Sequence, residues 1–397
     1  MQTLEINDNG SLVEMIQSAL TRANFFNSEI NGIFGTATQK AVIDFQKAFG
    51  LTEDGIVGNE TWKLLSDFIK GYCYKTTENE DKKLLFLVFN LIPTDISYSS
   101  ELVKNLTDGL KKRYSFIETG KIGTSTMGKD IPLLTIGNGK KNLFIGAAFH
   151  ANEWITVPIV MKFIERYLDA YISSTTIAGE DARYLFNNIK LHIAPLVNPD
   201  GVDLVTGALQ QGEFYANAVK ISNDFKDIPF PSGWKANILG TDLNLQFPAR
   251  WETARKIKYA QGFTRPAPRN FTGFSPLDAN EAKSVYDYTM KNDFDSILAY
   301  HTQGKVIYWK FADFLPHKSK EIAESLSCAS GYELEITPDF AANAGYKDWF
   351  IQTFNKPGYT IEAGIGESPL PLSQFDEIYS ANEPLIVRAM KETIERI

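Results

Sequence analysis

Cysteine, histidine and long apolar runs are all scarce in this 397-residue chain. The two cysteines, Cys73 and Cys328, form no Cys-x-x-Cys pair, which argues against a disulfide framework and against a zinc site made of thiolates. The longest apolar run, residues 84–92, contains Asn90 and is far shorter than the ~20 residues that cross a bilayer. We therefore expect two idle or buried thiols and no membrane contact.

An excess of positive charge is also lacking. The sequence holds 40 basic and 48 acidic residues, which gives a formal net charge of -8. Proteins that bind nucleic acid neutralise phosphates with lysine and arginine, and anionic membrane surfaces select for the same residues. The composition therefore gives no reason to expect a nucleic acid or a membrane as partner.

The chain does contain enough apolar material for at least one sizeable core, since 44% of its residues are hydrophobic. Its first part holds an internal repeat. Asn-Gly-Ile-Phe-Gly at 31–35, followed by Thr38, recurs as Asp-Gly-Ile-Val-Gly at 54–58, followed by Thr61. Each copy is a glycine-bounded turn with apolar residues at helical spacing after it, and another amphipathic segment precedes both. We predict a small three-helix domain over residues 1–70.

This first domain resembles a known binding module. The paired Gly-Ile-x-Gly turns and the Ala-Val-x-x-Phe-Gln segment at 41–46 make residues 10–66 similar to the peptidoglycan-binding domain found in many cell-wall hydrolases. The resemblance implies that peptidoglycan is the partner of this domain. The alternative is a purely structural helical cap on the next domain, because a fold does not fix a function.

Residues 71–94 are predicted to join this domain to the next one. The stretch 76–83 is charged and indicates an exposed connector, whereas residues 84–92 are mostly apolar and have to be buried. We expect the apolar run to dock on the second domain.

Strand-like and helix-like patterns alternate over residues 95–397. Short apolar runs bounded by polar residues predict strands at 131–136, 143–149, 190–197, 295–300 and 358–361. Periodic apolar residues predict helices at 102–110 and 157–172. Such alternation predicts an α/β domain with a mixed, mostly parallel sheet flanked by helices.

Two of the four histidines, His150 and His301, lie where a predicted buried strand gives way to a loop. In α/β sheets, ligands bind beyond the carboxyl ends of the strands. Glu153 follows His150 by three residues, so these three side chains can reach one metal ion as the two-histidine, one-carboxylate set of hydrolytic zinc sites. On its own His-x-x-Glu is a weak pattern that also occurs as a solvated pair. We predict His192 to be a core residue, since it lies mid-strand, and His317 to be solvated.

Five motifs then occur in the order seen in zinc carboxypeptidases, which the chain resembles from about residue 98 to its end: His-Ala-Asn-Glu-Trp-Ile-Thr from 150, Asn-Pro-Asp-Gly from 198, Gly-Thr-Asp-Leu-Asn from 240, Tyr-His-Thr-Gln from 300 and Tyr-Thr-Ile-Glu from 359. The resemblance implies one zinc ion per chain, held by His150, Glu153 and His301. It also implies that Glu362 is the general base and acid, and that Asp242 orients the imidazole of His150.

The chain departs from the digestive carboxypeptidases at positions that contact the substrate. Lys235 stands where those enzymes carry the arginine that stabilises the oxyanion, so it supplies charge without a bidentate fork. Leu245, directly after Asn244, stands where they carry the arginine that clamps the terminal carboxylate. Phe340 stands in place of their mobile tyrosine. We therefore predict that the carboxylate clamp of an exopeptidase is absent.

A new charge is predicted in the specificity pocket. Lys347 occupies a position that lines this pocket in the family, and a cationic residue there favours an acidic substrate group. The alternative is an ordinary surface lysine. Together with Lys347, we expect Asn152, Asn244 and Phe340 to contact the substrate.

A wall-binding module joined to a zinc peptidase without a carboxylate clamp predicts a hydrolase of peptidoglycan stem peptides. More narrowly, the chain resembles the γ-D-glutamyl-L-diamino acid endopeptidases of spore-forming bacteria, which cut between D-glutamate and diaminopimelate. One alternative is an exo-acting carboxypeptidase in which another residue, such as Arg250, replaces the clamp. A second alternative is a wall-binding protein with an idle catalytic domain. The sequence predicts no oligomeric state.

The first ten residues are polar and acidic and lack the basic-then-apolar order of a secretory signal. This pattern predicts a cytoplasmic protein. We expect such an enzyme to meet cell wall or spore cortex after release by lysis, or to act on imported wall fragments.

Overall fold

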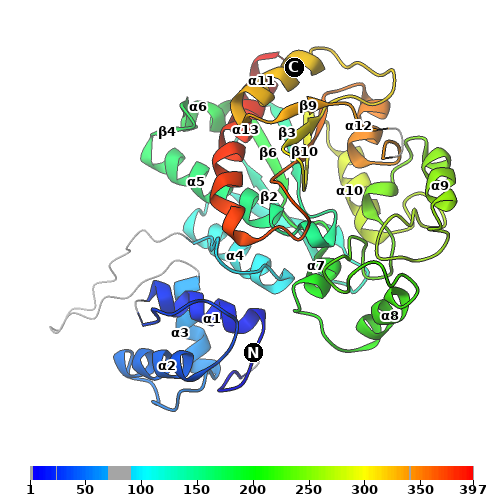
Figure 1. Cartoon of the computed structure of the whole chain (residues 1–397). Coiled ribbons are helices and arrows are strands. Elements are labelled where there is room, and N and C mark those ends of the chain that lie inside the picture. The colour runs from blue at the N-terminus through cyan, green and yellow to red at the C-terminus, as the bar shows by residue number, and fades with distance from the viewer. Residues whose placement is uncertain (1–2, 24, 70–90, 339–340, 397) are drawn as a thin grey trace.

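The computed structural model describes residues 3–23, 25–69, 91–338 and 341–396. Figure 1 shows a small helical unit, coloured blue, and a larger α/β unit built around one sheet. The connector 76–83, the apolar run as far as residue 90, Cys73 and Phe340 lie outside the described residues. Within them, Cys328 is a free and exposed thiol.

The small unit consists of α1 (Ser11–Arg22), α2 (Thr36–Ala48) and α3 (Asn59–Ile69). The helices of the α/β unit are α4 (Ser100–Arg113), α5 (Thr156–Ser173), α6 (Ala182–Asn188), α7 (Pro199–Val205), α8 (Glu213–Ser222), α9 (Trp251–Ala260), α10 (Asn280–Lys291), α11 (Ser319–Ser330), α12 (Tyr346–Phe354) and α13 (Phe375–Arg396). The described residues also form the short 3-10 helices Ala151–Glu153, Leu243–Leu245 and Leu372–Gln374. No helix in the described part of the chain has the length and apolar composition to cross a bilayer.

The two repeated turns of the small unit are each fastened by a buried glutamine. The first is held by Gln17 of α1, whose Nε2 donates to Thr38 Oγ1 at 2.9 Å and to the carbonyl oxygen of Ile33 at 3.0 Å. Its Oε1 accepts a hydrogen bond from the Gly32 amide at 3.0 Å. All the polar atoms of this side chain are thus satisfied inside the core, as buried amides require.

The second turn repeats this arrangement one helix later. Gln46 of α2 donates to Thr61 Oγ1 at 3.1 Å and to the Ile56 carbonyl at 2.9 Å, and it accepts from the Gly55 amide at 2.9 Å. The threonine that follows each glycine-bounded turn in the sequence is therefore the partner of a glutamine on the preceding helix. The repeat in the sequence corresponds to a repeated hydrogen-bonding unit.

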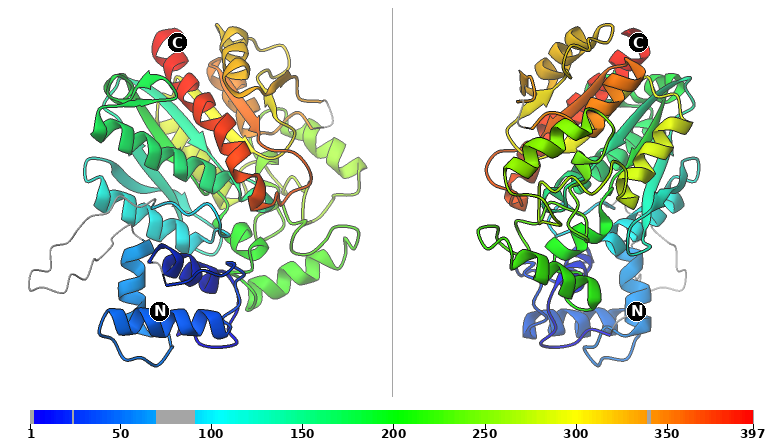
Figure 2. Two further views of the ribbon diagram at one scale, coloured as in Figure 1. Left: turned by 60° about the vertical axis from the view of Figure 1, so that its left-hand side comes forward. Right: turned by 90° about the vertical axis from the view of Figure 1, so that its right-hand side faces the viewer.

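The small unit is in contact with the α/β unit. Glu14 of α1 accepts a hydrogen bond from Ser97 Oγ at 2.5 Å. Arg22, at the end of α1, interacts electrostatically with Asp95 and Glu165. Apolar residues of both units also form one continuous cluster. Both views in Figure 2 show the three helices against the same side of the α/β unit.

The main sheet has eight strands in the order β1-β2-β6-β3-β7-β10-β8-β9. Their bounds are β1 (Glu118–Thr124), β2 (Asp130–Ile136), β3 (Lys141–Gly146), β6 (Ile189–Ala194), β7 (Ser296–His301), β8 (Val306–Tyr308), β9 (Glu333–Glu335) and β10 (Gly358–Glu362), while β4 (Thr176–Ile177) and β5 (Glu180–Asp181) form a separate pair. The central strands β6, β3, β7 and β10 are mutually parallel, and antiparallel pairs lie toward the edges. The predicted mixed, mostly parallel sheet is confirmed.

Helices cover both faces of this sheet, so its central strands are buried on both sides. In β3, Leu143 and Ile145 belong to the apolar cluster that contains α5 and α13. Phe144, between them, belongs to the cluster that contains α10 and α12. The two layers lie on opposite sides of the sheet in Figure 2. Burial on both faces explains why these strands read as continuous apolar runs.

Three adjacent parallel strands end at the same edge of the sheet and bring candidate site residues together there. Neighbouring strands β7 and β10 end at His301 and Glu362, which are register partners. On the other side of β7, β3 ends at Gly146, so the predicted strand 143–149 is three residues too long. The chain leaves the sheet there because Ala148 takes a left-handed conformation with φ of 51°. His150 therefore comes from a buried loop directly above the strand ends.

The mid-strand histidine is a core residue, as its position predicts. His192 Nδ1 lies 2.7 Å from Tyr288 Oη, and its Nε2 lies 3.2 Å from Asn142 Oδ1. Burial, and to a lesser extent the charge of Lys190, lower the pKa of His192 to about 4. His192 is therefore neutral in the folded protein at neutral pH.

This lowered pKa predicts an acid-sensitive contribution to stability. Between about pH 6.5 and 4 the unfolded chain takes up a proton at His192 that the folded chain does not, so stability falls as the pH is lowered through this window. We expect the free energy of unfolding, measured by urea titration, to fall less between pH 7.5 and 5.0 in His192→Gln than in wild type, by on the order of 1 to 2 kcal/mol. Identical pH slopes for the two proteins would contradict this account of His192.

The glutamine that fastens the second turn gives a further prediction. In Gln46→Ala the Gly55 amide loses its acceptor, and leaving such a buried donor unsatisfied costs about 1 to 3 kcal/mol. Hydrogen exchange of the amides at 55–61 should accelerate correspondingly. Lys40→Ala, on the exposed side of the same helix, is the matched control and should leave exchange unchanged. Unaltered protection in Gln46→Ala would show that the turn does not depend on this side chain.

Candidate active site

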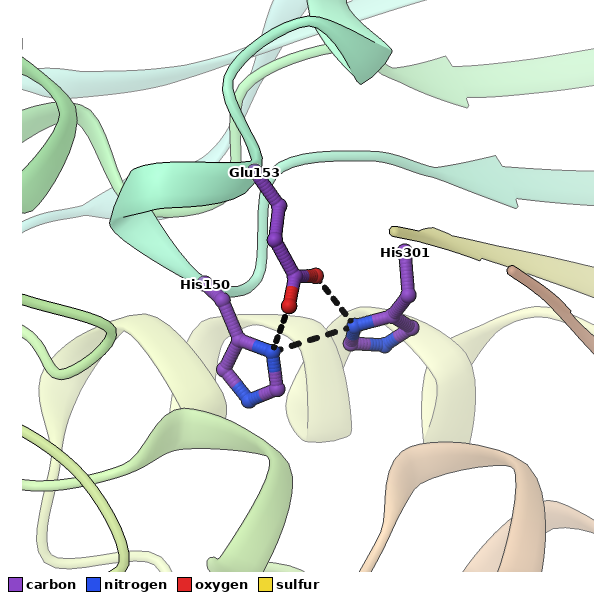
Figure 3. Close-up of side chains that lie close together, drawn as sticks. All are labelled: His150, Glu153 and His301. Atoms are coloured by element: carbon purple, nitrogen blue, oxygen red, sulfur yellow. Dashed lines mark hydrogen bonds and ion pairs between the residues drawn. The ribbon is translucent and has the colours of Figure 1, made fainter. Parts of the chain in front are cut away.

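Three side chains converge beyond the carboxyl ends of the central strands. Figure 3 shows the carboxylate of Glu153 between the rings of His150 and His301. Glu153 Oε1 lies 2.9 Å from His150 Nδ1, and Oε2 lies 2.9 Å from His301 Nδ1. The two Nδ1 atoms are 3.3 Å apart. The structure therefore brings together the three residues predicted as metal ligands.

The geometry of this group fits a zinc ion. Ligands at 2.0 to 2.1 Å in tetrahedral coordination are about 3.3 Å from one another, which is the Nδ1–Nδ1 separation of His150 and His301. The carboxylate of Glu153 completes a two-histidine, one-carboxylate donor set that leaves one position open. The donors and their separations thus match a hydrolytic zinc site.

Asp242 fixes which nitrogen of His150 faces the group. His150 Nε2 donates to Asp242 Oδ1 at 3.0 Å, which leaves Nδ1 as the nitrogen directed at Glu153. Asp242 is itself held by the backbone amides of Asn244, at 3.2 Å, and Asn270, at 3.0 Å. A carboxylate behind a histidine in this way orients the ring and raises its basicity. This contact is the one that the sequence resemblance implies for Asp242.

The buried charges of the group stabilise one another. Burial disfavours the charged form of Glu153, yet His150 and Lys235 hold the pKa of this carboxyl well below its usual range. Burial alone would lower the pKa of His150, but Glu153 and Asp242 raise it to about 9. A proton on Nδ1 therefore balances the carboxylate when no cation is bound. A metal ion at this point would take the place of that proton, so metal binding would release protons.

The loop that carries His150 and Glu153 is fastened by polar contacts that the motifs supply. Thr156, at the start of α5, accepts from the Ala148 amide at 3.0 Å and donates to the Glu153 carbonyl at 2.8 Å. Asn198, the first residue of the Asn-Pro-Asp-Gly motif, donates to the carbonyls of Phe149 at 3.2 Å and Ala236 at 3.1 Å. These bonds join the loop of His150 to the segment that carries Lys235.

The group opens into a cavity of about 210 Å³ whose lining includes His150, Lys235, Asp242 and Glu362. Burial, and then the charge of Glu153, raise the pKa of Glu362 to about 8. A carboxyl that titrates near neutral pH can both accept and return a proton. Lys235 donates to Glu153 Oε1 at 2.8 Å, which brings its ammonium group to the edge of the trio.

Two of the four predicted substrate residues line this cavity. Asn244 lines the cavity, and its Oδ1 accepts a hydrogen bond from the Tyr346 amide at 3.0 Å. Lys347 also lines it, is only 4% exposed and is therefore no surface lysine. Its Nζ lies 2.5 Å from Asp348 Oδ1 and donates to the Lys310 carbonyl at 2.9 Å. The charge of Lys347 is thus balanced within the protein, which weakens its predicted role as the cation of the pocket.

Two other residues named from the sequence are not among the described residues that line the cavity, and a third is not described. Asn152 is 1% exposed, is not among the described residues lining the cavity, and donates to the Ser368 carbonyl at 3.3 Å, and its contact with substrate stays a prediction. Arg250 is exposed, lies over the Phe311 ring and is likewise absent from the described lining. Phe340 lies outside the described residues.

Among the lining residues that sequence reasoning missed are Lys258 of α9 and Tyr308 of β8. Lys258 shares the buried face of α9 with Trp251 and Ala254, at helical spacing. A lysine on an otherwise apolar face is a signal that the sequence does contain. Tyr308 gives no comparable signal, because its place follows from the pairing of β8 with β10, where it is the register partner of Thr360.

Comparison with known protein families divides the chain as the motifs do. The zinc carboxypeptidase family matches residues 103–383, and a peptidoglycan binding domain family matches residues 9–65. The γ-D-glutamyl-L-diamino acid endopeptidase 1 of Lysinibacillus sphaericus is 43% identical over 295 residues, which cover 74% of this chain and 72% of that protein. The protein YqgT of Bacillus subtilis strain 168 is 37% identical over 279 residues, covering 70% and 73%.

Solved structures agree with the fold. The crystal structure of carboxypeptidase A from Helicoverpa armigera superposes with a TM-score of 0.57 at 18% identity and covers 99% of this chain and 100% of that one. The helices and the mixed sheet described above are thus those of a carboxypeptidase fold. The family match over most of the chain, together with the convergent histidines and carboxylate, shows that the protein belongs to the zinc carboxypeptidase family of metallopeptidases and also contains a peptidoglycan binding domain.

Proposed function

We propose that the protein hydrolyses the stem peptides of peptidoglycan at the γ-D-glutamyl-diaminopimelate bond. The observation that carries this proposal is a zinc-type donor set beside a wall that has a leucine, Leu245, at the position of the exopeptidase clamp. The name of the Lysinibacillus sphaericus relative and the peptidoglycan binding domain both support it. In this proposal residues 1–70 hold the enzyme on the wall and residues 95–397 carry the reaction.

Leu245 supports endopeptidase action because it contributes no charge where the clamp would be. It is buried in a small apolar cluster with Trp251, Ala254 and Ala344. An exopeptidase needs a cation that fixes the terminal carboxylate next to the scissile bond. A substrate whose chain continues past the cut residue has no such carboxylate, and an apolar wall accepts it without leaving a buried charge unpaired.

The proposed roles of the residues follow from their contacts. His150, Glu153 and His301 would hold the zinc ion, which supplies a Lewis acid that polarises the carbonyl and acidifies water. Glu362 would accept the proton of the attacking water and pass it to the leaving amine, as its pKa of about 8 permits.

Two further residues would support the reaction. Lys235 has three N–H donors, of which one is directed at Glu153, so the others are available to the oxyanion. Asp242 would keep the ring of His150 in position throughout.

The ligand assignment predicts how variants differ in metal content. We expect wild-type protein to retain about one zinc ion per chain after dialysis, and Glu153→Gln or His301→Asn to retain almost none, because a neutral amide is a far weaker ligand. Glu362→Gln should keep its zinc while kcat falls by about 100-fold or more. Plasma emission spectrometry measures the metal, and full occupancy in Glu153→Gln would contradict the assignment.

The reaction itself is tested with defined muropeptides. Zinc-loaded protein is incubated with tripeptide, tetrapeptide and pentapeptide stems, and the products are identified by mass spectrometry. We expect loss of everything beyond D-glutamate in one step from all three stems, and product formation slowed by about 100-fold or more in the Glu362→Gln control. Stepwise loss of single terminal residues would instead establish a carboxypeptidase and would sink the endopeptidase proposal.

A further inference from the structure

A buried ion pair forms part of the wall of the active-site cavity. Lys347 and Asp348, in the first turn of α12, are 4% and 3% exposed, and both line the same cavity as Glu362. Lys347 Nζ lies 2.5 Å from Asp348 Oδ1. Withdrawing two charges from water is costly, so a buried ion pair adds little to the stability of a fold. Polar groups placed in an otherwise apolar pocket more often serve to orient and select a ligand.

Both members of this pair keep hydrogen-bonding capacity. An ammonium group has three N–H donors, and the described residues take up two of those of Lys347, through Asp348 and through the carbonyl of Lys310 at 2.9 Å. A carboxylate has about four acceptor positions, and Asp348 accepts from Lys347 and from the Asn343 amide at 3.1 Å. One donor and further acceptor positions are therefore left for a molecule in the cavity.

A missing side chain opens the cavity beside the carboxylate of the pair. Gly345 lines the cavity with φ of -77° and ψ of 157°, a conformation that residues with side chains also adopt. A Cβ atom at this position would lie 3.3 Å from Asp348 Oδ2 and 3.4 Å from Asn244 Oδ1. The backbone does not require glycine here, so the effect of this residue is to leave the space between the two polar groups to a ligand.

The wall next to this opening is apolar. Leu245, which follows Asn244, lines the cavity and packs in one cluster with Ala344, the neighbour of Gly345. A substrate side chain that fits here combines an apolar stem with a polar end. The protein offers a cation and an anion in contact, so an end that carries both charges pairs each of them. An end with one charge would add a net charge to a buried neutral pair and leave it uncompensated.

We propose that Lys347 and Asp348 together bind the zwitterionic end of the diamino acid on the leaving side of the cut bond. This inference rests on the proposed function. The side chain of diaminopimelate is a short chain of methylene groups that ends in one carbon with both an amino group and a carboxylate. Lys347 donates to the carboxylate and Asp348 accepts from the ammonium group, while the methylene groups lie along Leu245. The two residues thus determine specificity as one unit, in place of the single cation that Lys347 alone would provide.

The experiment deletes each charge of the substrate in turn. The zinc-loaded full chain is assayed on stem tripeptides whose third residue is diaminopimelate, lysine, 2-aminopimelate or norleucine. Relative to diaminopimelate, lysine lacks the distal carboxylate, 2-aminopimelate lacks the distal amino group, and norleucine lacks both. Each substrate is tested with wild type, Lys347→Met, Asp348→Asn and Lys256→Met, in which an exposed lysine is changed as the matched control.

We expect wild type to cleave the diaminopimelate tripeptide with a kcat/KM about 10- to 100-fold above those of the lysine and 2-aminopimelate tripeptides, the effect of one charge-assisted hydrogen bond. Norleucine should be at least as good as either, because it brings no unpaired charge. The ratio of kcat/KM for lysine over 2-aminopimelate should rise about tenfold or more in Lys347→Met, which leaves the anion. It should fall about tenfold or more in Asp348→Asn, which leaves the cation, and stay unchanged in Lys256→Met. A damaged fold does not produce shifts in opposite directions.

Wild type that cleaves lysine or 2-aminopimelate tripeptides as fast as the diaminopimelate tripeptide would overturn the inference, because one of the two charges would then go unrecognised. Norleucine slower than both would also overturn it, since the two charges would then act independently. These comparisons need no variant, so they decide the matter even if Lys347→Met or Asp348→Asn fails to fold. A ratio that stays unchanged in either folded variant, or moves the same way in both, would equally contradict it. All of these results leave the proposed function intact, whereas absence of any stem cleavage by zinc-loaded wild type would mean that the proposed function itself fails.

Discussion

The buried carboxylate of Glu153 is the constraint on which the active site depends. It is 1% exposed, and a charge withdrawn from water to this degree is costly unless it is paired and hydrogen bonded. His150, His301 and Lys235 all direct nitrogen atoms at its two oxygens. A cation at their meeting point would satisfy the carboxylate and would take the place of a proton between the two imidazole nitrogens, which lie 3.3 Å apart.

The fold serves this group by bringing together residues from distant parts of the chain. Only parallel neighbours end at the same edge of a sheet, and β3, β7 and β10 deliver His150, His301 and Glu362 to that edge. The small helical unit, which precedes the sheet in the sequence, is held together differently. Gln17 and Gln46 each fix one of its two repeated turns by hydrogen bonds. Each unit is thus stabilised by its own internal contacts, and polar contacts between the units, such as the hydrogen bond from Ser97 to Glu14, join them.

The sequence predicted the parts of the site that are tied to strand ends. A continuous apolar run predicts a buried strand, and His150 and His301 directly follow such runs, so the sequence places both of them at strand ends. The ordered motifs added Glu153, Asp242 and Glu362. Residues fixed only by tertiary packing were harder to predict. Lys347 is buried as a pocket residue should be, but the sequence alone does not show that its ammonium group turns toward the adjacent carboxylate of Asp348 and the carbonyl of Lys310. Asn152 lies in a motif yet turns toward Ser368, and Lys258 belongs to a helix outside the recognised motifs. The strand at 143–149 was predicted too long because buried loop residues are as apolar as strand residues.

The most direct test of this account is a crystal structure of the zinc-loaded protein with anomalous data collected at the zinc absorption edge. The account predicts one strong peak per chain, about 2.0 to 2.2 Å from the Nδ1 atoms of His150 and His301 and from a carboxylate oxygen of Glu153. Nε2 of His150 should still donate to Asp242. A peak at any other group of side chains, or zinc bound through Nε2 of His150 with Asp242 released, would contradict it.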